Sequence, residues 1–293
     1  MYRMLPIVVL AACSAKQSPS TPDAAMTMDA APTMEEAAMP APEETVVAVA
    51  PIASALDHAG RTDEEKARDM YRHPEETLTF FEVSPNQTVV ELWAGGGWYS
   101  HVLAPYLTDG GGHLYVTQYP EDAEPAYRGR HATAWKAYVE EQGYADSTTT
   151  ITLGDEPPEL GLDGEADVVL TFRNVHNWAK ADIDTHMFQQ AFTALKPGGV
   201  FGVVDHRAAP GTDPAVAMEA GYIDEQAVID AVTAVGFEFV GSSEINANPL
   251  DTKDHPEGVW TLPPSYRLED VDRDKYSAIG ESDRMTLKFR KPM

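Results

Sequence analysis

Two histidines and an aspartate follow strand-like apolar runs and are the clearest candidates for proton chemistry in this sequence. His176 comes four residues after the run 166–172, and Asp205 and His206 directly follow the run 200–204. Neighbouring parallel strands end at the same edge of a sheet, so these three side chains are expected to lie together. A histidine beside a carboxylate can accept and relay a proton near neutral pH. The alternative is that the three groups only cap strand ends by hydrogen bonding to loop backbone.

Metal binding is a second chemistry that these residue types allow. Asn174, His176, Asp205 and His206 offer oxygen and nitrogen ligands that a divalent ion could take. The sequence has neither a zinc-type Cys/His spacing nor a His-Glu-x-x-His motif. We therefore expect no metal at this position.

A ligand site is indicated by the stretch 88–100, which reads Thr-Val-Val-Glu-Leu-Trp-Ala-Gly-Gly-Gly-Trp-Tyr-Ser. Its β-branched start predicts a strand that ends at Glu91, and the segment 98–107 has apolar residues at helical spacing. Between them, Gly95, Gly96 and Gly97 let the backbone turn sharply and leave room for a ligand. A strand, a glycine turn and a helix in this order are typical of a nucleotide-like ligand site, although such a turn can also bind nothing.

Alternating strands and helices along the rest of the chain must position these residues. The strands are near-continuous apolar runs, as expected for a sheet that helices cover on both faces. We predict one α/β domain over residues 56–293, with a Rossmann-like, doubly wound, mostly parallel sheet. The predicted helices are 64–71, 74–81, 98–107, 132–142, 182–195 and 224–235, and the predicted strands are 88–91, 113–118, 148–153, 166–172, 200–204, 237–243 and 285–289.

Composition limits the class of protein and its partners. A chain of 293 residues, 43% of them apolar, is long enough to form one large globular domain or two small ones. The net charge of −26, without any run of Lys or Arg, argues against a nucleic-acid partner, because such proteins place cations where the phosphates lie. We interpret the excess of acidic residues as a solvated surface.

The first residues predict export and a lipid anchor. Residues 1–12 have a short positive start and an apolar segment too short to span a bilayer, and Leu10-Ala-Ala-Cys13 resembles the lipobox of bacterial lipoproteins. That resemblance implies cleavage before Cys13, lipidation of this residue, and a location on the periplasmic side of the outer or inner membrane. The alternative is an ordinary secretion signal with an incidental cysteine. Residues 13–55 lack aromatic residues and are expected to be a disordered tether, so that only the lipidated N-terminus contacts the membrane.

The domain as a whole resembles the class I S-adenosylmethionine-dependent methyltransferases, and among them a group of predicted, often exported bacterial methyltransferases. The resemblance covers about residues 63–292 and implies S-adenosylmethionine as the cofactor. It rests on an ordered set of motifs, which are Tyr71-Arg-His-Pro74, Glu91-Leu-Trp-Ala-Gly-Gly-Gly-Trp-Tyr99, Leu170-Thr-Phe-Arg-Asn-Val-His-Asn-Trp178, Leu195-Lys-Pro-Gly-Gly199, Val204-Asp-His-Arg207, Asn246-Ala-Asn-Pro249, Lys253-Asp-His-Pro256 and Gly280-Glu-Ser-Asp-Arg284.

The resemblance also implies which residues meet the cofactor. The glycine turn would lie under its methionine and ribose parts, Asp155 near its adenine, and the backbone at Arg173 and Asn174 near its methionine amino group. The expected cofactor contacts are Glu91, Gly95, Gly96, Gly97, Gln118, Asp155, Arg173 and Asn174.

Two positions depart from the family pattern. Trp93 stands where Asp/Glu-x-Gly-x-Gly-x-Gly has its first glycine, and Gln118 stands where an acid normally holds the ribose hydroxyls. An amide bonds a hydroxyl without charge assistance. Weaker cofactor binding, or a different ligand, is therefore expected.

A long insertion, 245–283, separates the last two predicted strands. A connection of this length is typically functional, and its proline and aromatic residues argue for an ordered cover on the site. The junction 71–73 between two predicted helices is a second candidate substrate contact, or else a packed corner. The full set of candidate substrate contacts is Tyr71, Arg72, His73, Trp98, Trp178, Lys253, His255 and Trp260.

Two functions of different class remain open. The first is an S-adenosylmethionine-dependent methyltransferase acting on a small molecule, which the glycine turn with Glu91 favours. The second is a lipid-anchored, non-catalytic protein that binds another ligand on the same fold, which Trp93 and Gln118 favour. The expected location adds to the second, because S-adenosylmethionine is made inside the cell and fold alone does not decide function. A dehydrogenase is disfavoured, because the glycines lack the Gly-x-Gly-x-x-Gly spacing.

Overall fold

The computed structural model describes residues 51–154 and 158–293. Cys13, Asp155, the predicted signal and most of the predicted tether lie outside these residues. The strands of the described part are β1 (Thr88–Leu92), β2 (His113–Gln118), β3 (Thr148–Thr152), β4 (Ala166–Phe172), β5 (Leu195–His206), β6 (Glu238–Ser243) and β7 (Arg284–Arg290).

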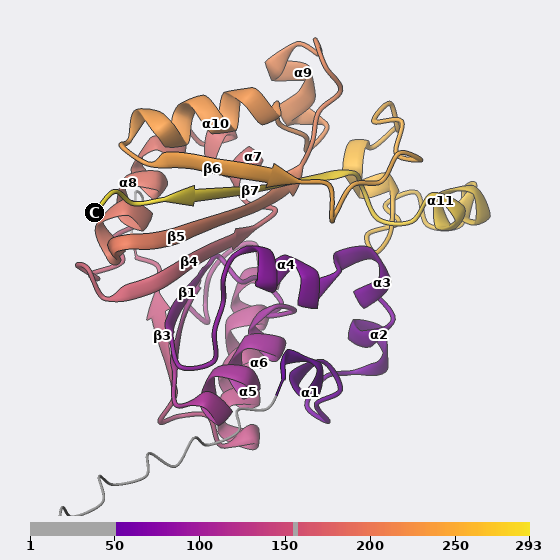
Figure 1. Ribbon diagram of the computed structural model, residues 1–293. Helices are drawn as coiled ribbons and strands as arrows, with labels where there is room; N and C mark the ends of the chain where they lie inside the picture. Colours follow the sequence, from indigo (N-terminus) through magenta and orange to yellow (C-terminus); the bar gives the residue numbers. More distant parts are fainter. Residues whose placement is uncertain (1–50, 155–157) are drawn as a thin grey trace, which may run out of the picture. The chain divides into compact units, whose positions relative to one another are not determined.

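These strands form one sheet with the order β3-β2-β1-β4-β5-β7-β6 (Figure 1). Pairing is parallel from β3 across to β5, and β7 runs antiparallel to both of its neighbours. The prediction of a Rossmann-like, doubly wound, mostly parallel sheet is confirmed. Strand β5 begins earlier than predicted, because Gly198 and Gly199 exchange backbone hydrogen bonds with Lys291 after β7.

Helices cover both faces of the sheet. The described helices are α1 (Ile52–Leu56), α2 (Asp63–Lys66), α3 (Asp69–Arg72), α4 (Pro74–Phe80), α5 (Ser100–Gly110), α6 (Tyr127–Gln142), α7 (Val175–Lys180), α8 (Asp184–Ala194), α9 (Pro214–Glu219), α10 (Glu225–Ala234), the 3-10 turn η1 (Gly258–Thr261) and α11 (Arg273–Ile279). None of them is long and apolar enough to cross a membrane.

The alternation of side chains along the strands divides the buried core into two parts. Val168 and Leu170 of β4 point toward a cluster that contains residues of α1, α4, α5 and α6. Val169, between them, points into the opposite cluster with residues of α7, α8 and α10. Both faces of β4 are therefore covered, which explains why this strand reads as a continuous apolar run.

Several helices differ from the sequence-based expectation. The helix predicted at 64–71 is two short helices, α2 and α3, and the start of α2 carries the expected cap, in which Thr62 and Glu65 bond each other's backbone. Helix α1 lies before the predicted domain start, yet Ile52 and Ala55 are buried. Helix α7 forms where only a strand end was expected, and it places His176 in its first turn.

The insertion 245–283 is ordered and contains η1 and α11. It follows the carboxyl end of β6 and is the yellow region beside the strand ends in Figure 1. Its residues 259, 260 and 263–265 line a cavity together with His176 and His206. The fold therefore brings the insertion onto the edge of the sheet that holds the candidate site.

Candidate functional site

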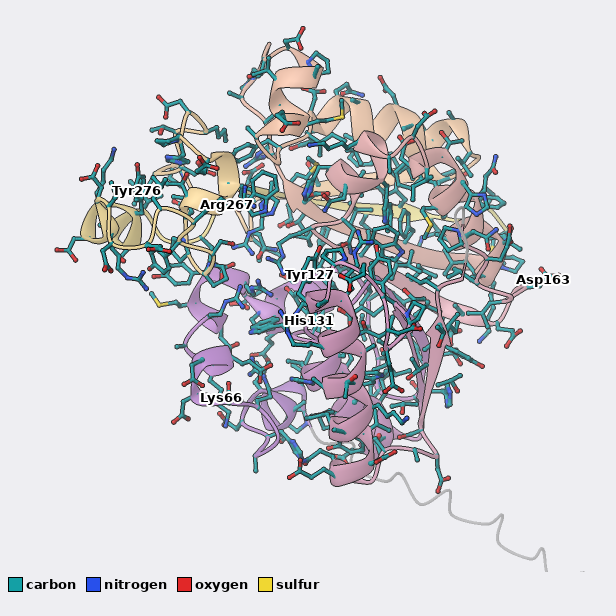
Figure 2. All side chains as sticks on the ribbon, turned by 180° about the vertical axis from the view of Figure 1, so that it is seen from behind. Lys66, Tyr127, His131, Asp163, Arg267 and Tyr276 are labelled. Carbon is teal, nitrogen blue, oxygen red and sulfur yellow. The ribbon has the colours of Figure 1, made fainter. Side chains whose placement is uncertain are left out.

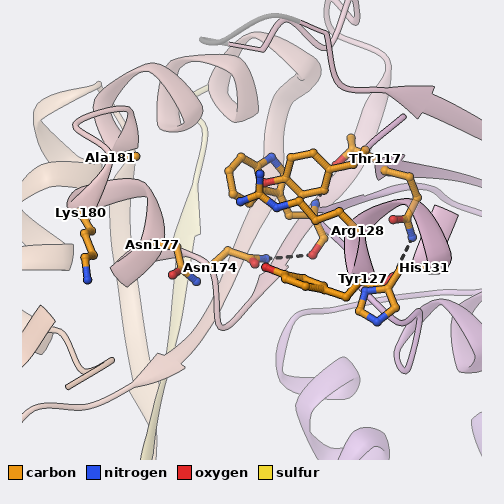
Figure 3. A pocket seen from close by; sticks show the side chains of 12 residues that line it. Thr117, Tyr127, Arg128, His131, Asn174, Asn177, Lys180 and Ala181 are labelled. Carbon is orange, nitrogen blue, oxygen red and sulfur yellow. Dashed lines mark hydrogen bonds between the residues drawn. The ribbon is translucent and has the colours of Figure 1, made fainter. Parts of the chain in front are cut away.

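Two adjoining cavities lie at the carboxyl ends of β1, β2 and β4. The first cavity has a volume of about 370 Å³, and Figure 3 shows the side chains that line it. Its lining residues are Trp93, Gly95, Thr117, Gln118, Tyr119, Tyr127, Arg128, His131, Asn174, Asn177, Lys180 and Ala181. This is the size and place expected for a nucleotide-like ligand on a doubly wound sheet.

The second cavity is smaller, about 230 Å³, and carries the ionisable groups. Trp93, Gly95, His131, Asn174 and Asn177 line both cavities, so the two adjoin. The other lining residues of the second cavity are Ala94, Gly96, Phe172, Arg173, His176, His206, Val259, Trp260, Pro263, Pro264, Ser265, Glu281 and Ser282.

Of the glycine turn, Gly95 lines both cavities, Gly96 lines the second, and Gly97 lines neither. Gly95 has a left-handed φ of +58°, and no atom lies within 4 Å of the Cβ that it lacks. A Cβ at Gly97 (φ +76°) would instead meet the His101 ring at 3.2 Å. Gly95 is thus the glycine whose missing side chain leaves open space for a ligand. At Gly97, a side chain would instead crowd the ring of His101.

Trp93 takes the place of the family's first glycine without filling the first cavity. Its backbone is left-handed (φ +51°) and its N–H donates to Thr117 Oγ1 at 2.7 Å. The indole packs against the rings of Tyr119 and Trp178, with centroids 5.3 and 5.8 Å apart. The ring is therefore directed along the cavity wall and held there by aromatic neighbours.

Glu91 is buried at the end of β1 and reaches neither cavity. Its carboxyl accepts a hydrogen bond from Ser100 Oγ at 2.6 Å, which ties the strand to the first residue of α5. Burial raises the pKa of Glu91 to about 8, against the opposing effects of Ser100, Arg72 and Arg173. Glu91 is therefore mostly protonated at neutral pH and supports the turn as a neutral group.

Two amides fix the ends of the central strands. Gln118 donates from Nε2 to the carbonyl oxygen of Gly95 at 3.0 Å and lines the first cavity. Asn174 donates from Nδ2 to the carbonyl oxygens of Leu92 and Trp93 at 3.0 and 3.2 Å. Both predicted cofactor contacts therefore hold the glycine turn in position as well as facing the cavity.

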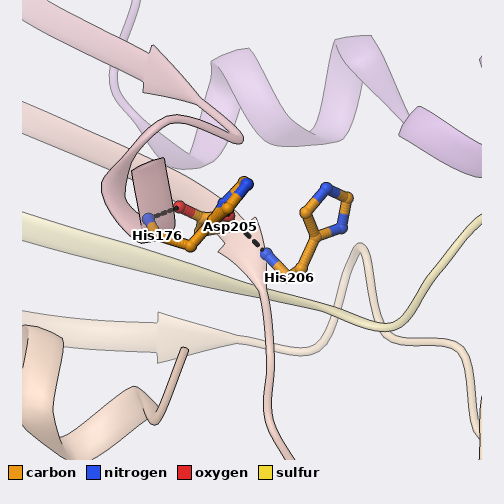
Figure 4. Close-up of side chains that lie close together, drawn as sticks. All are labelled: His176, Asp205 and His206. Atoms are coloured by element: carbon orange, nitrogen blue, oxygen red, sulfur yellow. Dashed lines mark hydrogen bonds and ion pairs between the residues drawn. The ribbon is translucent and has the colours of Figure 1, made fainter. Parts of the chain in front are cut away.

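His176, Asp205 and His206 lie together, as Figure 4 shows. The Asp205 carboxylate is fully buried and accepts hydrogen bonds from the backbone N–H groups of His176 and His206 at 3.0 and 2.7 Å. It also lies 2.8 Å from His176 Nδ1. With a proton on Nδ1 facing Asp205, His176 Nε2 is left as a proton acceptor.

His206 is the second buried imidazole of this group. Its ring centroid lies 5.3 Å from that of His176, and its Nδ1 meets Ser282 Oγ. Burial, together with His176 and nearby arginines, lowers the pKa of His206 well below its ordinary value. His206 is therefore a neutral imidazole at physiological pH.

These three residues are also the one group of the described part whose ligand atoms could meet a metal ion, all within 4.8 Å of one another. Both Asp205 oxygens, however, already accept hydrogen bonds from His176 or His206. The charges of Arg72, Arg173 and Arg284 also act on His206 and would repel a further cation. The donor set suits a proton relay better than a metal centre.

A cluster of arginines stands beside the second cavity around one acid, Glu281. The Glu281 carboxylate lies 2.7 Å from Arg68, 3.2 Å from Arg72 and 3.1 Å from Arg284. Burial would raise the pKa of Glu281, but these arginines and Arg173 outweigh it and hold the pKa at about 2. Glu281 is therefore ionised at every physiological pH.

The predicted substrate contacts divide into two groups. Of the eight, Trp260 alone lines one of the two cavities. Trp178 is fully buried in the core, and Trp98 lies under the guanidinium groups of Arg61 and Arg72, which are 5.1 and 4.6 Å from its centroid.

The remaining five candidates hold other segments together or lie apart from both cavities. Lys253 pairs with Asp283 at 2.7 Å, and His255 with Asp251 at 2.8 Å, which fixes the insertion. Arg72 is buried against Glu281, and the backbone carbonyl of Tyr71 accepts from Arg284. His73 joins α3 to α4 with a left-handed φ of +40°.

Sequence reasoning missed several cavity residues, and two groups of them show why. Tyr127, Arg128 and His131 lie in the first turns of α6, which begins five residues earlier than predicted (Figure 2). The polar segment before 132 gave no apolar period that could have shown this. Glu281 and Ser282 line the second cavity. They belong to the motif Gly280-Glu-Ser-Asp-Arg284, for which the sequence predicted no role.

Neither protein-family models nor curated proteins give a match to this chain. Solved structures do match its fold. An S-adenosylmethionine-dependent methyltransferase from Aquifex aeolicus is 14% identical, with a TM-score of 0.51 over 77% of this chain and 93% of its own. The [4+2]-cyclase SpnF is 14% identical, with a TM-score of 0.53 over 83% of this chain and 92% of its own. The chain therefore has the class I methyltransferase fold, and a fold that also serves a cyclase does not by itself fix the reaction.

Proposed function

We propose that the protein is an S-adenosylmethionine-dependent methyltransferase that acts on a small-molecule acceptor. One observation carries the proposal: a cavity on the glycine turn opens directly beside a cavity walled by a buried His176–Asp205 pair. The first is suited to the cofactor and the second to the acceptor.

The residues around the first cavity fit that cofactor. Gly95 leaves open space where any other residue would place a Cβ, and Gln118 and Asn174 hold the turn around it. The cavity, about 370 Å³, lies within the 300–1,000 Å³ range typical of ligand sites. When bound, S-adenosylmethionine would supply an electrophilic methyl group. Gly95, Gly96, Gln118 and Asn174 are the residues of this chain that would hold it.

His176 is the proton acceptor in this proposal. Methylation of an O–H or N–H group releases one proton, and His176 Nε2 takes it while Nδ1–H stays bonded to Asp205. Asp205 acts on His176 by fixing the ring orientation and stabilising the imidazolium that forms. The base contributes only for acceptors that still carry their proton at working pH.

Trp260 and its neighbours supply the other requirement, a site that excludes water. Val259, Trp260, Pro263 and Pro264 of the insertion line the second cavity together with the two histidines. An apolar cover strengthens the electrostatic interactions beneath it and holds the acceptor close to the reacting group. This assigns a function to the insertion as part of the acceptor site.

Trp93 favours a second candidate, a non-catalytic ligand-binding protein on the same fold. A bulky aromatic residue with a left-handed φ of +51° replaces the glycine of the family pattern, and it lines both cavities.

For either function, we expect the domain to be exported and tethered through Cys13. Cys13→Ser should move the protein from the membrane to the soluble fraction of fractionated cells, and an unchanged distribution would refute the anchor.

Calorimetric titration of the purified full-length protein with S-adenosylmethionine and S-adenosylhomocysteine tests the function. Micromolar binding, about −8 kcal/mol, is expected in the wild type. Gly95→Ala should abolish it, and Gly111→Ala is the matched control. Gly111 also has a left-handed φ (+76°) and open space at its Cβ, but it ends α5 away from the cavities. Each alanine strains the backbone by about 1 kcal/mol, so the two variants should differ in binding and not in stability.

The outcomes separate the two candidates. Binding lost in Gly95→Ala and kept in Gly111→Ala supports the cofactor site. Binding kept in both would place the cofactor elsewhere. Absence of heat and of any thermal shift in the wild type at millimolar ligand would leave the ligand-binding candidate. Gly97→Val is a poorer test, because its side chain would displace His101.

A further inference from the structure

Positive charges outnumber negative ones beside the second cavity. Four guanidinium groups, those of Arg68, Arg72, Arg173 and Arg284, act on Glu281. Asp205 is the other carboxylate that acts on Arg173. Glu91 does not restore the balance, because burial keeps it mostly protonated. Four positive charges therefore face two negative ones.

The shortage of acceptors is visible in individual atoms. Arg68 Nη2 and Arg72 Nη2 are buried and have no hydrogen-bond partner among the residues that the structure describes. Arg72 is only 1% exposed, so almost none of its surface can bond to solvent water in place of the missing acceptor. A buried cation without a full set of acceptors destabilises the folded state. Such a cluster is stable only if burial elsewhere offsets the cost, and it is suited to receive an anion.

Arg173 is the member of the cluster that faces the second cavity. Its backbone has a left-handed φ of +65° and its N–H donates to the Val204 carbonyl at 2.7 Å, which fixes the residue at the end of β4. Within residues 51–154 and 158–293, no carboxylate pairs with its guanidinium. Arg173 lines the cavity together with His176 and His206.

The proposed cofactor cannot neutralise this charge. The amino-acid end of S-adenosylmethionine carries one carboxylate and one ammonium group, so its net charge is zero, and the sulfonium adds a positive charge. Any carboxylate–arginine pair that it forms is therefore accompanied by at least one new cation. The missing negative charge has to come from the other ligand.

We propose that the methyl acceptor carries an oxyanion, a carboxylate or a phosphate, that Arg173 binds in the second cavity. This inference rests on the proposed function. A planar guanidinium can bond two oxygens of such a group at once, which fixes orientation as well as position. With the anion held by Arg173, the nucleophile of the same small molecule lies toward His176. Arg68, Arg72 and Arg284 do not line the cavity, but their charges, which Glu281 neutralises only in part, add to the positive potential around Arg173.

The test measures anion binding to the full-length protein by thermal shift and calorimetry, with and without S-adenosylhomocysteine. The probes are inorganic phosphate and benzoate, and benzamide is the neutral match of benzoate. Ionic strength is held constant, because salt screens such interactions. At ten times its dissociation constant, the binding probe should raise the Tm by about 3 to 6 °C. Benzamide should not. Phosphate and benzoate arms also decide between the two kinds of oxyanion.

Arg173→Gln should lose the anion response at least tenfold in affinity, and Arg173→Lys should keep part of it. Arg130→Gln is the control, since Arg130 is exposed and lines neither cavity. Without ligand, Arg173→Gln should be about as stable as the wild type, because the lost repulsion from Arg68 and Arg284 offsets the lost attraction to Glu281 and Asp205. A merely structural Arg173 would instead give a less stable variant.

Three results would overturn the inference: no anion response in the wild type, an equal response in Arg173→Gln, or an equal response to benzamide. These results are separable from the fate of the proposed function. Cofactor binding without anion binding removes the anionic acceptor and leaves the methyltransferase. Anion binding without cofactor binding confirms the anion site and points to the ligand-binding candidate.

Discussion

Glu91 and Glu281 are buried to nearly the same extent, at 2% and 4% exposed, but their pKa values lie at about 8 and about 2. Glu91 has one direct partner, the Ser100 hydroxyl, and its arginines act from a distance. Glu281 has three arginines in direct contact. Burial sets the cost of a charge, and the number of cations in contact decides whether the charge persists.

The contrast separates two regions of one site. The groups that hold the strand end and the glycine turn, Glu91, Ser100, Gln118 and Asn174, are neutral, while Arg128 and Lys180 are the cationic residues that line the first cavity. The region beside the second cavity carries buried ions and an excess of positive charge. The first region supports its turn without a buried charge, and the second is suited to an anionic partner. The following experiments change one member of the pair at a time.

Glu281→Gln should have the largest effect. Removing the one acid that Arg68, Arg72 and Arg284 share leaves buried cations uncompensated, at a cost of about 3–5 kcal/mol in the free energy of unfolding. Glu82→Gln is the control, because Glu82 pairs with Arg290 and Lys288 on the surface and should cost at most about 1 kcal/mol. Urea unfolding of both variants measures the difference. Equal losses would mean that Glu281 is not the centre of the cluster.

The same acid predicts how the protein responds to low pH. Because the folded pKa of Glu281 lies below the unfolded value of 4.5, its stabilisation is present above pH 4.5. It is lost as the pH falls through about 2. The wild type should therefore lose stability over this acid range more steeply than Glu281→Gln. Parallel curves of Tm against pH would contradict the ionised state of Glu281.

Glu91→Gln should show the opposite dependence on pH. The folded pKa of Glu91 lies above 4.5, so its contribution is fully present below pH 4.5 and is lost as the pH rises through about 8. Between these values the variant should gain stability over the wild type by about 1.4 kcal/mol per pH unit. Thermal unfolding from pH 4 to 9 measures this. A constant difference would mean that Glu91 does not titrate in this range.

The sequence predicts one of these regions better than the other. The strands are apolar runs and the glycine turn is a local motif, so the end of β1 and Glu91 could be located from short-range pattern. His176 and Asp205 could also be placed together, because parallel strands end at one edge. The pairing of Glu281 with Arg68 and Arg72 joins residues 213 and 209 positions apart, and no local pattern encodes it. The sequence also does not separate the candidate tryptophans, because a Trp signals burial without saying whether it lies in the core, like Trp178, or at a cavity, like Trp260.

Ser100→Ala should have the smallest effect and sharpens the comparison at its neutral end. The Ser100 hydroxyl bonds Glu91 at 2.6 Å and lowers its pKa, so its loss should move the decline in stability to higher pH and cost about 1 kcal/mol. Ser147→Ala is the matched control. Ser147 bonds the Thr108 hydroxyl at 2.6 Å, and its loss should cost a similar amount without moving the pH at which stability declines. In Glu91→Gln the pH effect of Ser100→Ala should vanish, because the two groups interact directly. A pH shift that persists there would show that a group other than Glu91 titrates beneath the glycine turn.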